Sequence, residues 1–526
     1  MGWIDWFVVF LYIAGILWLG FSIGRKQEDQ EDYYLAGKTM KPWQVAFSIM
    51  STQVSAISLI GAPAFVALKK GGGLVWLQYE LGVPIAMAAL ILFFVPSFYK
   101  SGGITIYEFL EKRFDRSVRQ SISLIFLISR GLGTGVALLA TSVVTSVCLK
   151  IPLEDTILIT GIVTIIYTTM GGIKADIYSD IIQLFIFVAG TLFSIGIVGF
   201  FLWKEGIPLH FPDPSRLEVF KFSETGFGDA STFAFWPMVL GGFFLYMSYY
   251  GCDQSQAQRL LTTGTERESQ KALLLNGIFR FPITLTYIFF GLLLIPFLDA
   301  HREFASVMRG KPYDFLVPEF IMKFFPVGLK GIMVAGIFAA TMSSVDSALN
   351  SLSAATWRDF LQPLRIKFKF GRSEVLPLRI LTVLWGIFAI ASAFIFLGGP
   401  ETVIELVNKI GSAFYGPILA VFAMAIFFKG IKGREILSGL FSGVVFNVLL
   451  WVFFEKQVSW MWWNFTGFAV TVIVAILLAF TARRRLIFKV PSLSDLSLSN
   501  TKILVAVFPL FMLLCFVLEK ILEKLY

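Results

Sequence analysis

Apolar runs of about twenty residues recur from one end of the chain to the other, and this pattern limits the fold more than any other feature. Each run is long enough to cross the hydrocarbon core of a bilayer, which is roughly 30 Å thick. The runs are continuous, so they predict helices and not the alternating strands of a barrel. Because only 15% of the residues are charged, a soluble domain of this size is excluded. We therefore predict an all-α, multi-pass membrane protein.

We predict about fourteen transmembrane helices in a single domain, 1–526, because no polar stretch is long enough to bury a core of its own. The first span is too long for the apolar region of a signal peptide and lacks a basic stretch before it. The three cysteines lie in or beside apolar runs, which predicts free thiols. The expected spans are 4–24, 45–68, 73–98, 120–148, 155–171, 176–202, 233–252, 271–296, 330–356, 377–398, 402–428, 435–454, 459–482 and 502–520.

The net charge of +9 lies mainly in short loops between these spans, where it indicates topology and not nucleic-acid binding. Arg25 and Lys26 follow the first span and place its end in the cytoplasm. Alternation of the spans then places the other basic clusters on the same side, at 112–119, 365–372, 429–434 and 483–485. The pattern predicts a protein of the plasma (inner) membrane with both termini outside.

Two of the expected spans, 45–68 and 330–356, carry an unusual number of polar residues. One or two serines in a span are explained by close helix packing and hydrogen bonds between helices. A dense polar patch that includes a carboxylate favours a binding site, because an unpaired charge in lipid is costly. The patches comprise Ser48, Ser51, Thr52, Gln53, Ser55 and Ser58 in the first span, and Thr341, Ser343, Ser344, Asp346, Ser347, Asn350 and Ser351 in the second.

Six short motifs resemble those of the sodium:solute symporters, which include sodium/glucose, sodium/galactose, sodium/proline, sodium/iodide and sodium/sialic acid transporters. They occur in family order between Tyr33 and about Phe428. The motifs are DYYLAGK at 32–38, YEFLEKRF at 107–114, YTTMGGIKADIYSDIIQ at 167–183, DQSQAQRLL at 253–261, FPVGLKGIMVAGIFAATMSSVDSALNS at 325–351 and FYGP at 414–417.

The resemblance implies a five-plus-five inverted-repeat core of the leucine-transporter type. Its halves correspond to about 45–202 and 233–428, with extra helices at 4–24 and 435–520. The first helix of each half is expected to be broken near the bilayer midplane. The first break is expected around 51–55 and the second in span 233–252, which contains Gly241, Gly242 and Gly251.

The resemblance also implies a first sodium site between the broken span 45–68 and span 330–356. Sodium prefers several oxygen ligands, and a broken helix leaves backbone carbonyls available to it. Ala340, Ser343 and Ser344 have the spacing of one helix face. The implied ligands are the carbonyls of Ser51, Val54 and Ala340 with the hydroxyls of Ser343 and Ser344.

A second sodium site, known in some family members, matches Asp180, Ser343, Asp346 and Ser347. Asp346 departs from the family pattern, in which a serine is expected. Two carboxylates at one intramembrane site repel each other unless a cation or a proton lies between them. Two sodium ions per solute is our prediction, and coupling to a proton stays open. The alternative for Asp180 is a helix cap near the cytoplasmic surface.

Matching to the sugar-transporting members implies a solute site formed by Gln53, Ser58, Glu80, Tyr246 and Arg280, with Tyr249 as the inner gate. Glu80 and Arg280 are ionisable residues within apolar spans, so each is expected to have a partner. The planar guanidinium of Arg280 suits a carboxylate or a vicinal diol. Arg130 is a second cation within a span, which either reaches the inner surface or contacts the solute. Tyr249 is either a gate or an ordinary interfacial aromatic.

We predict a symporter that uses sodium to import a small polar solute by alternating access. A sugar, a polyol and a small carboxylate are all open as the solute. A membrane sensor with the same fold is the alternative. An enzyme is not expected, because no nucleophile–base pair, zinc motif or phosphate-binding loop is recognisable. The expected partners are the solute, sodium and the lipid bilayer, without nucleic acid or an obligate protein partner.

Overall fold

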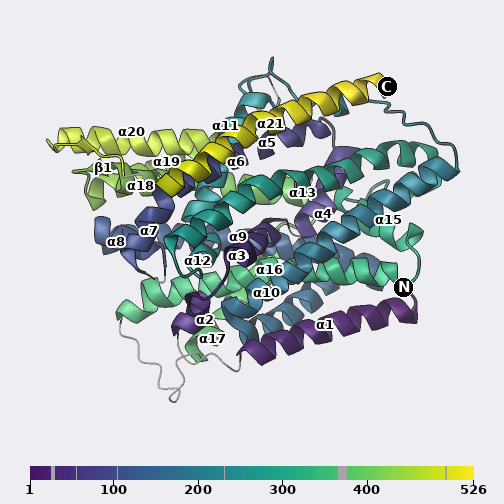
Figure 1. The fold of residues 1–526 in the computed structure, drawn as a ribbon, viewed down its shortest axis with the longest axis horizontal. Coiled ribbons are helices and arrows are strands. Elements are labelled where there is room, and N and C mark those ends of the chain that lie inside the picture. The colour runs from purple at the N-terminus through teal and green to yellow at the C-terminus, as the bar shows by residue number, and fades with distance from the viewer. Residues whose placement is uncertain are drawn as a thin grey trace.

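The computed structural model describes residues 1–526 except 25–29, 55, 104, 230, 365–375, 400, 492–494 and 526. The described chain is almost entirely helical, and a helix covers each of the apolar runs (Figure 1). The longer helices are α1 (Trp3–Gly24), α3 (Pro42–Gln53), α4 (Ala56–Leu68), α6 (Gly82–Ala89), α9 (Arg116–Leu149), α10 (Leu153–Lys204), α11 (Phe235–Cys252), α13 (Glu266–Ala300), α16 (Leu329–Ala355), α17 (Leu376–Ile395), α18 (Val403–Phe427), α19 (Gly433–Phe454), α20 (Trp463–Thr481) and α21 (Asp495–Leu525).

Shorter helical segments connect these or break them, and two short strands form one antiparallel pair in which Phe428 lies opposite Phe488. The strands are β1 (Phe428–Lys429) and β2 (Ile487–Phe488). The short helical segments are α2 (Gln30–Leu35), η1 (Ala36–Lys38), η2 (Leu74–Trp76), α5 (Leu77–Glu80), η3 (Leu90–Phe94), α7 (Val95–Ser101), α8 (Tyr107–Arg113), η4 (Pro214–Arg216), α12 (Gln254–Leu260), α14 (Arg302–Val307), η5 (Tyr313–Phe315), α15 (Leu316–Phe324), η6 (Thr356–Leu361), η7 (Gln362–Leu364) and η8 (Trp460–Trp462).

In the described residues, ten helices are long and apolar enough to cross a membrane, and the bent pair α3–α4 makes an eleventh. The count of fourteen spans is therefore not confirmed. α11 falls outside the apolar set because its tyrosines and glycines lower its hydropathy. Within α10, positions 172–175 are helical where we expected a loop between two spans. The polar residue that follows them, Asp176, is buried in an ion pair, so polarity there marks a packed charge and not a loop.

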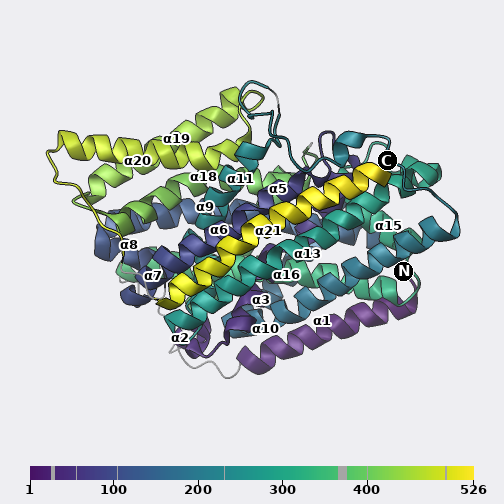
Figure 2. The same ribbon diagram turned by 45° about the horizontal axis from the view of Figure 1, so that its top comes forward.

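Helix α16 lies in the middle of the bundle, where it packs against α10, α9, α1 and α17. α19 and α20 pack against α18 at one end of the molecule, and α21 crosses α6 and α13 on the outside (Figures 1 and 2). Both termini lie at the same end of the bundle, whereas α8 and β1, which carry basic residues, lie at the opposite end. The basic residues at 25–26 and 365–372 fall outside the described residues. Cys148, Cys252 and Cys515 are buried free thiols, as predicted.

The first expected helix break is confirmed. α3 and α4 meet at an angle of 51°, and α3 ends at Gln53, because the φ of −82° and ψ of 69° of the following Val54 are not helical. The polar residues of this span thus lie on either side of a bend within an otherwise apolar crossing. Ser55 falls outside the described residues.

The second break is displaced from the glycine pair. α11 is a regular helix through Gly241 and Gly242 and ends at Cys252, and the extended backbone of Asp253 (ψ 123°) separates it from α12. The break expected in span 233–252 thus falls at the end of that span, beside Gly251 and not at Gly241 or Gly242. A Cβ atom on Gly241 would lie 2.1 Å from the carbonyl oxygen of Met461. Glycine at this position permits close helix packing, which is the usual reason for small residues between membrane helices.

Candidate functional site

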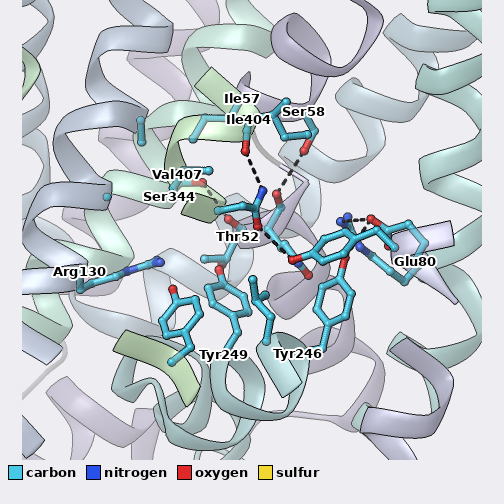
Figure 3. Close-up of a pocket in the computed structure, with 18 of the residues that line it drawn as sticks. Thr52, Ile57, Ser58, Glu80, Arg130, Tyr246, Tyr249, Ser344, Ile404 and Val407 are labelled. Carbon is cyan, nitrogen blue, oxygen red and sulfur yellow. Dashed lines mark hydrogen bonds and ion pairs between the residues drawn. The ribbon is translucent and has the colours of Figure 1, made fainter. Parts of the chain in front are cut away.

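A cavity lies beside the bend between α3 and α4 (Figure 3). α9, α11 and α18 provide other parts of its wall. The structure brings all the sequence-predicted solute residues, the gate residue and one predicted sodium ligand to this one cavity. These residues are Gln53, Ser58, Glu80, Tyr246, Arg280, Tyr249 and Ser344. Their roles toward a solute or an ion stay predictions.

Glu80 and Arg280 are partners, as expected of two ionisable residues within spans. Nη2 of Arg280 lies 3.2 Å from Oε1 of Glu80, and the hydroxyl of Tyr246 donates to the same oxygen at 3.0 Å. The three side chains are 3% exposed or less. In the described residues, Oε2 of Glu80 and both Nε and Nη1 of Arg280 lack hydrogen-bond partners. Buried polar atoms are normally paired, so these three atoms are available to a polar ligand.

Arg130 lies in the wall of the same cavity, across from Glu80 (Figure 3). Its guanidinium carbon is 5.8 Å from the centroid of the Tyr249 ring. Nε of Arg130 is buried without a hydrogen-bond partner, and no carboxylate forms an ion pair with this side chain in the part of the chain that the structure describes. Of the two alternatives for Arg130, the structure therefore favours contact with the cavity over extension to the inner surface.

Tyrosines of α11 separate the cavity from the break at Asp253. Tyr249 is buried, and its hydroxyl accepts a hydrogen bond of 2.9 Å from Nε2 of Gln256 on α12. The neighbouring Tyr250 donates to Oε1 of Gln53. The side chain of Gln53 thus already has a partner within the protein, and the backbone carbonyl of Gln53 accepts a hydrogen bond from the hydroxyl of Ser58 at 3.3 Å. Tyr249 has the position of a gate residue, between the cavity and the segment that follows the break.

The predicted first sodium site lies where α16 meets the bend. The hydroxyl of Ser344 donates to the carbonyl of Thr52 at 3.1 Å, so α16 contacts the last turn of α3 as expected. The carbonyl that it contacts belongs to Thr52, one residue away from the predicted Ser51. Among the described residues, the buried Oγ of Ser51 has no hydrogen-bond partner, which leaves one hydroxyl oxygen for a cation.

The remaining predicted ligands of this site are described less completely. Val54 is buried at the end of α3, beside the bend. Helix α16 runs through Ala340 and Ser343, but their side chains fall outside the described residues. The oxygen atoms that are described fit the preference of sodium for hydroxyl and carbonyl ligands.

Three residues of the predicted second sodium site lie in one buried cluster around Arg259, namely Asp180, Asp346 and Ser347. The side chain of the fourth, Ser343, falls outside the described residues. Nη2 of Arg259 is 3.1 Å from Oδ2 of Asp180 and donates to Oγ of Ser347. Asp176, which lies one helical turn before Asp180, is 3.4 Å from the same nitrogen. Asp346 is also buried and accepts from Asn350 at 3.3 Å. Neither Arg259 nor Asp176 was among the predicted site residues.

The sequence contains a signal for this cluster in a polar segment that has the appearance of an exposed loop. The motif at 253–261 is polar and follows an apolar span, which is the usual appearance of a solvent-exposed connection. In the structure the motif forms α12, in which every residue is buried. A polar helix buried on all sides requires internal partners, and Arg259 has them on α3, α10 and α16.

Comparisons with known proteins agree with this architecture. A family model described as the sodium:solute symporter family matches residues 33–443. The sodium/sialic acid symporter NanT of Aliivibrio fischeri is 26% identical over 91% of this chain and 93% of its own. The sodium-coupled monocarboxylate transporter 2 of Bos taurus is 29% identical over 81% of this chain and 68% of its own.

Solved structures show the same fold. A substrate-bound, outward-open structure of a Na⁺-coupled sialic acid symporter covers 93% of this chain and all of its own, with a TM-score of 0.79 and 21% identity. The nucleobase-cation symporter Mhp1 in a closed conformation covers 90% of this chain and 99% of its own, with a TM-score of 0.51 and 13% identity. These likenesses support the leucine-transporter type of fold expected from the sequence.

Proposed function

Because this chain belongs to the sodium:solute symporter family, we propose that it couples the entry of sodium to the uptake of a small carboxylate that also carries hydroxyl groups. The family assignment makes the chain a transporter and not an enzyme. The observation that supports a carboxylate is the charge of the cavity. Two guanidiniums, Arg130 and Arg280, line the cavity with one carboxylate, that of Glu80.

The second guanidinium requires an anion. Glu80 neutralises Arg280 through their ion pair of 3.2 Å, whereas Arg130 has no such partner in the described residues. A buried charge within a membrane protein is costly unless it is paired. A carboxylate on the solute supplies the missing charge and matches the planar fork of a guanidinium.

The ion pair on the opposite wall supports hydroxyl groups on the same solute. Oε2 of Glu80 accepts no hydrogen bond from the described residues, so it can accept one from a hydroxyl. Tyr246 and Tyr79 present aromatic surface beside it, with ring centroids 4.8 Å apart. Two relatives described above are named for sialic acid and for monocarboxylates, which are both organic acids. A neutral sugar satisfies Glu80 but brings no anion to Arg130, which interacts with the carboxylate of Asp253 at longer than ion-pair distance.

The position of the first sodium site supports direct coupling to the solute. Thr52 accepts the hydrogen bond from Ser344 and also lines the cavity, and the adjacent Gln53 lines it too. A cation that orders the bend between α3 and α4 thereby orders one wall of the solute site. Such shared ordering makes the two binding events cooperative, because each ligand stabilises the conformation that the other requires.

Alternating access follows from two broken helices in two related halves, about 45–202 and 233–428. We propose that α3–α4 and α11–α12 are the corresponding broken helices, and that Tyr249 closes the inner path. The end of the bundle that carries α8 and β1 is the cytoplasmic end, because basic residues are concentrated there (Figure 1). Both termini then lie outside the plasma membrane.

A ligand screen with the purified protein tests the proposed function. Thermal unfolding is measured in sodium and in choline buffer with lactate, pyruvate, gluconate, sialic acid and glucose. A ligand present at about 100 times its Kd stabilises the folded state by about 2.7 kcal/mol. We expect stabilisation by carboxylates in sodium buffer only, and more by hydroxylated ones. Stabilisation by glucose alone, or equally in both buffers, contradicts the proposal.

A further inference from the structure

Two connections between helices meet at the end of the bundle that we assign to the cytoplasm. One leads from α18 to α19 through β1, and the other leads from α20 towards α21 through β2 (Figure 1). The antiparallel pairing of β1 with β2 joins them, and the backbone N–H of Lys489 also donates to the carbonyl of Phe427 at 2.7 Å. The two connections therefore form one surface, although they lie far apart in the sequence.

The two connections approach each other closely at Gly430. Its φ of 97° lies in the left-handed region, which favours glycine. A Cβ atom at this position would lie 2.3 Å from the carbonyl oxygen of Arg485, so a larger residue requires a shift of the backbone. An ion pair of 3.3 Å between Arg484 and Glu435 also links the two connections. Backbone geometry and this ion pair thus hold the basic residues of both connections on one surface.

Exposed basic residues are concentrated on this surface, which we call the basic patch. Glu435 is the one carboxylate of segments 428–435 and 481–491, and it already pairs with Arg484. Asp115 lies against Gly433 and caps α9, where it accepts the backbone N–H of Val118 at 3.0 Å. Like charges held close together repel one another, so the patch favours an anion. Its six exposed cations are Lys429, Lys432, Arg434, Arg483, Arg485 and Lys489.

Apolar side chains are exposed beside these cations. Ile487 is 50% exposed, Phe488 62% and Val490 51%. The ring of Phe488 lies 6.0 Å from that of Phe427, the last residue of α18, so it is at the level where an apolar spanning helix ends. Apolar side chains among cations are typical of a surface that contacts lipid headgroups and the adjoining part of the acyl chains. A soluble anion would use the cations but leave this apolar surface in water.

We propose that the basic patch binds an anionic phospholipid of the inner leaflet. The lipid phosphate contacts lysines and arginines of both connections, and an acyl chain lies against Phe488 and the end of α18. The inference depends on the proposed orientation of the bundle but not on the solute or on sodium. β1 directly continues α18, which lines the solute cavity with Val407 and Asn408. The bound lipid thus holds the inner end of a helix that forms the solute site.

Native mass spectrometry of the detergent-purified full chain tests the inference by counting bound lipids. The chain is titrated with dioleoyl phosphatidylglycerol and, separately, with dioleoyl phosphatidylcholine, which has no net charge. A basic residue beside an anionic lipid gains about fivefold in affinity, so we expect phosphatidylglycerol to bind at least about tenfold more tightly. Equal affinities for the two lipids overturn the inference. Binding of free glycerol 3-phosphate as tight as that of phosphatidylglycerol also overturns it.

Each connection provides a variant of its own. Arg483→Gln combined with Arg485→Gln removes two charges from one connection, and Lys429→Gln combined with Lys432→Gln removes two from the other. Either double variant should lower the affinity for phosphatidylglycerol by about tenfold or more. If one of them does not fold, the other still decides. Unchanged affinity in either folded variant overturns the shared site.

Arg267→Gln combined with Lys271→Gln is the matched control. Both residues are exposed near the start of α13, beside Glu266 and Glu268 and outside the basic patch. The control therefore loses the same net charge as each double variant. We expect its affinity for phosphatidylglycerol to stay within about twofold of the wild type. A loss equal to that of the patch variants would mean that the lipid responds to net charge alone, and would overturn the assignment.

Phe488→Ser tests the apolar part of the site. It removes exposed aromatic surface and leaves the six cations in place, so phosphatidylglycerol affinity should fall by about fivefold or more. The preference for phosphatidylglycerol over phosphatidylcholine should persist, because the charges remain. Unchanged affinity for phosphatidylglycerol in this variant contradicts contact between the acyl chain and Phe488.

Discussion

The guanidiniums of Arg259 and Arg130 are both buried within the helix bundle, yet their surroundings differ. Each side-chain nitrogen of Arg259 donates to an oxygen of the protein. Arg130 keeps a buried Nε without a partner in the described residues and faces a cavity. A fully paired charge holds the structure together, whereas a charge with a free donor beside a cavity can be completed by a ligand. The comparison separates two kinds of intramembrane arginine that look alike in the sequence.

The largest expected effect comes from removing the paired arginine. Arg259→Gln leaves two buried carboxylates without their cation, and loss of one partner of a buried pair costs roughly 3–5 kcal/mol of folding stability. Thermal and denaturant unfolding should show this loss. Arg130→Gln should unfold close to the wild type. Equal destabilisation by the two substitutions would remove the distinction between the two arginines.

A carboxylate outside the spans extends the comparison to pH. Asp314 in η5 accepts the backbone N–H of Val403 at 3.1 Å, while its Oδ1 is buried without a partner in the described residues. Burial, with a smaller contribution from Glu405, raises the pKa of Asp314 to about 7, against the opposing hydrogen bond from Val403 and the charge of Lys69.

A raised pKa means that the folded state holds this proton more tightly than the unfolded chain does. Folding stability should therefore fall as pH rises from 5 to 7, by roughly 2–3 kcal/mol from this group, and then level off. Unfolding measured across this pH range should show a flatter profile for Asp314→Asn. An identical profile in the variant would mean that Asp314 does not titrate in this range.

The unpaired arginine should affect the solute more than the fold. Arg130→Gln removes a charge-assisted hydrogen bond to the solute carboxylate, which contributes about 1.5–3 kcal/mol. Carboxylate affinity should fall by roughly 10- to 150-fold, with the Kd for sodium unchanged in the absence of solute. Isothermal titration with the best carboxylate of the screen measures both. Arg130→Lys keeps the charge but not the planar fork. Its carboxylate affinity should lie between those of the wild type and Arg130→Gln.

The smallest expected effect concerns the first sodium site. Ser344→Ala removes one hydroxyl at the bend, a loss of about 1 kcal/mol that corresponds to roughly a fivefold rise in the sodium concentration for half-maximal uptake. Membrane insertion and the amount of folded protein should not change. Uptake into proteoliposomes at varied sodium concentrations measures the shift. Ser392→Ala, whose hydroxyl donates to the carbonyl of Phe388 in its own helix α17 at 2.9 Å, is the control.

Much of the solute cavity was predictable because its residues interrupt apolar spans. Glu80 and Arg280 stand out in the sequence as ionisable residues within apolar spans. The structure pairs them although they lie 200 positions apart in the chain. The bend between α3 and α4 was also predictable, since a cluster of small polar residues weakens an otherwise apolar span. Apolar periodicity located the spans themselves, although it did not fix their number.

The cluster around Arg259 was not predictable by the same means. Its partners are 79, 83, 88 and 211 positions away, and only tertiary packing brings them together. Polarity in the sequence does not distinguish exposure to water from pairing inside the protein. The exact position of the second helix break was not predictable for a related reason: three glycines lie in span 233–252, Gly241 serves close packing, and a glycine in a sequence does not reveal which use it has.

The close approach at Gly241 has a mechanical consequence. Here α11 touches the backbone of Met461 without an intervening side chain, so van der Waals contact between backbone atoms, and not side-chain rotamers, sets the distance between them. A contact of this kind tolerates rolling or sliding of the helix but not separation, which would open a void that nothing fills. α11 carries Tyr249 near its far end. A small tilt of α11 about Gly241 therefore displaces Tyr249 sideways by a larger distance, because Tyr249 lies further along the helix.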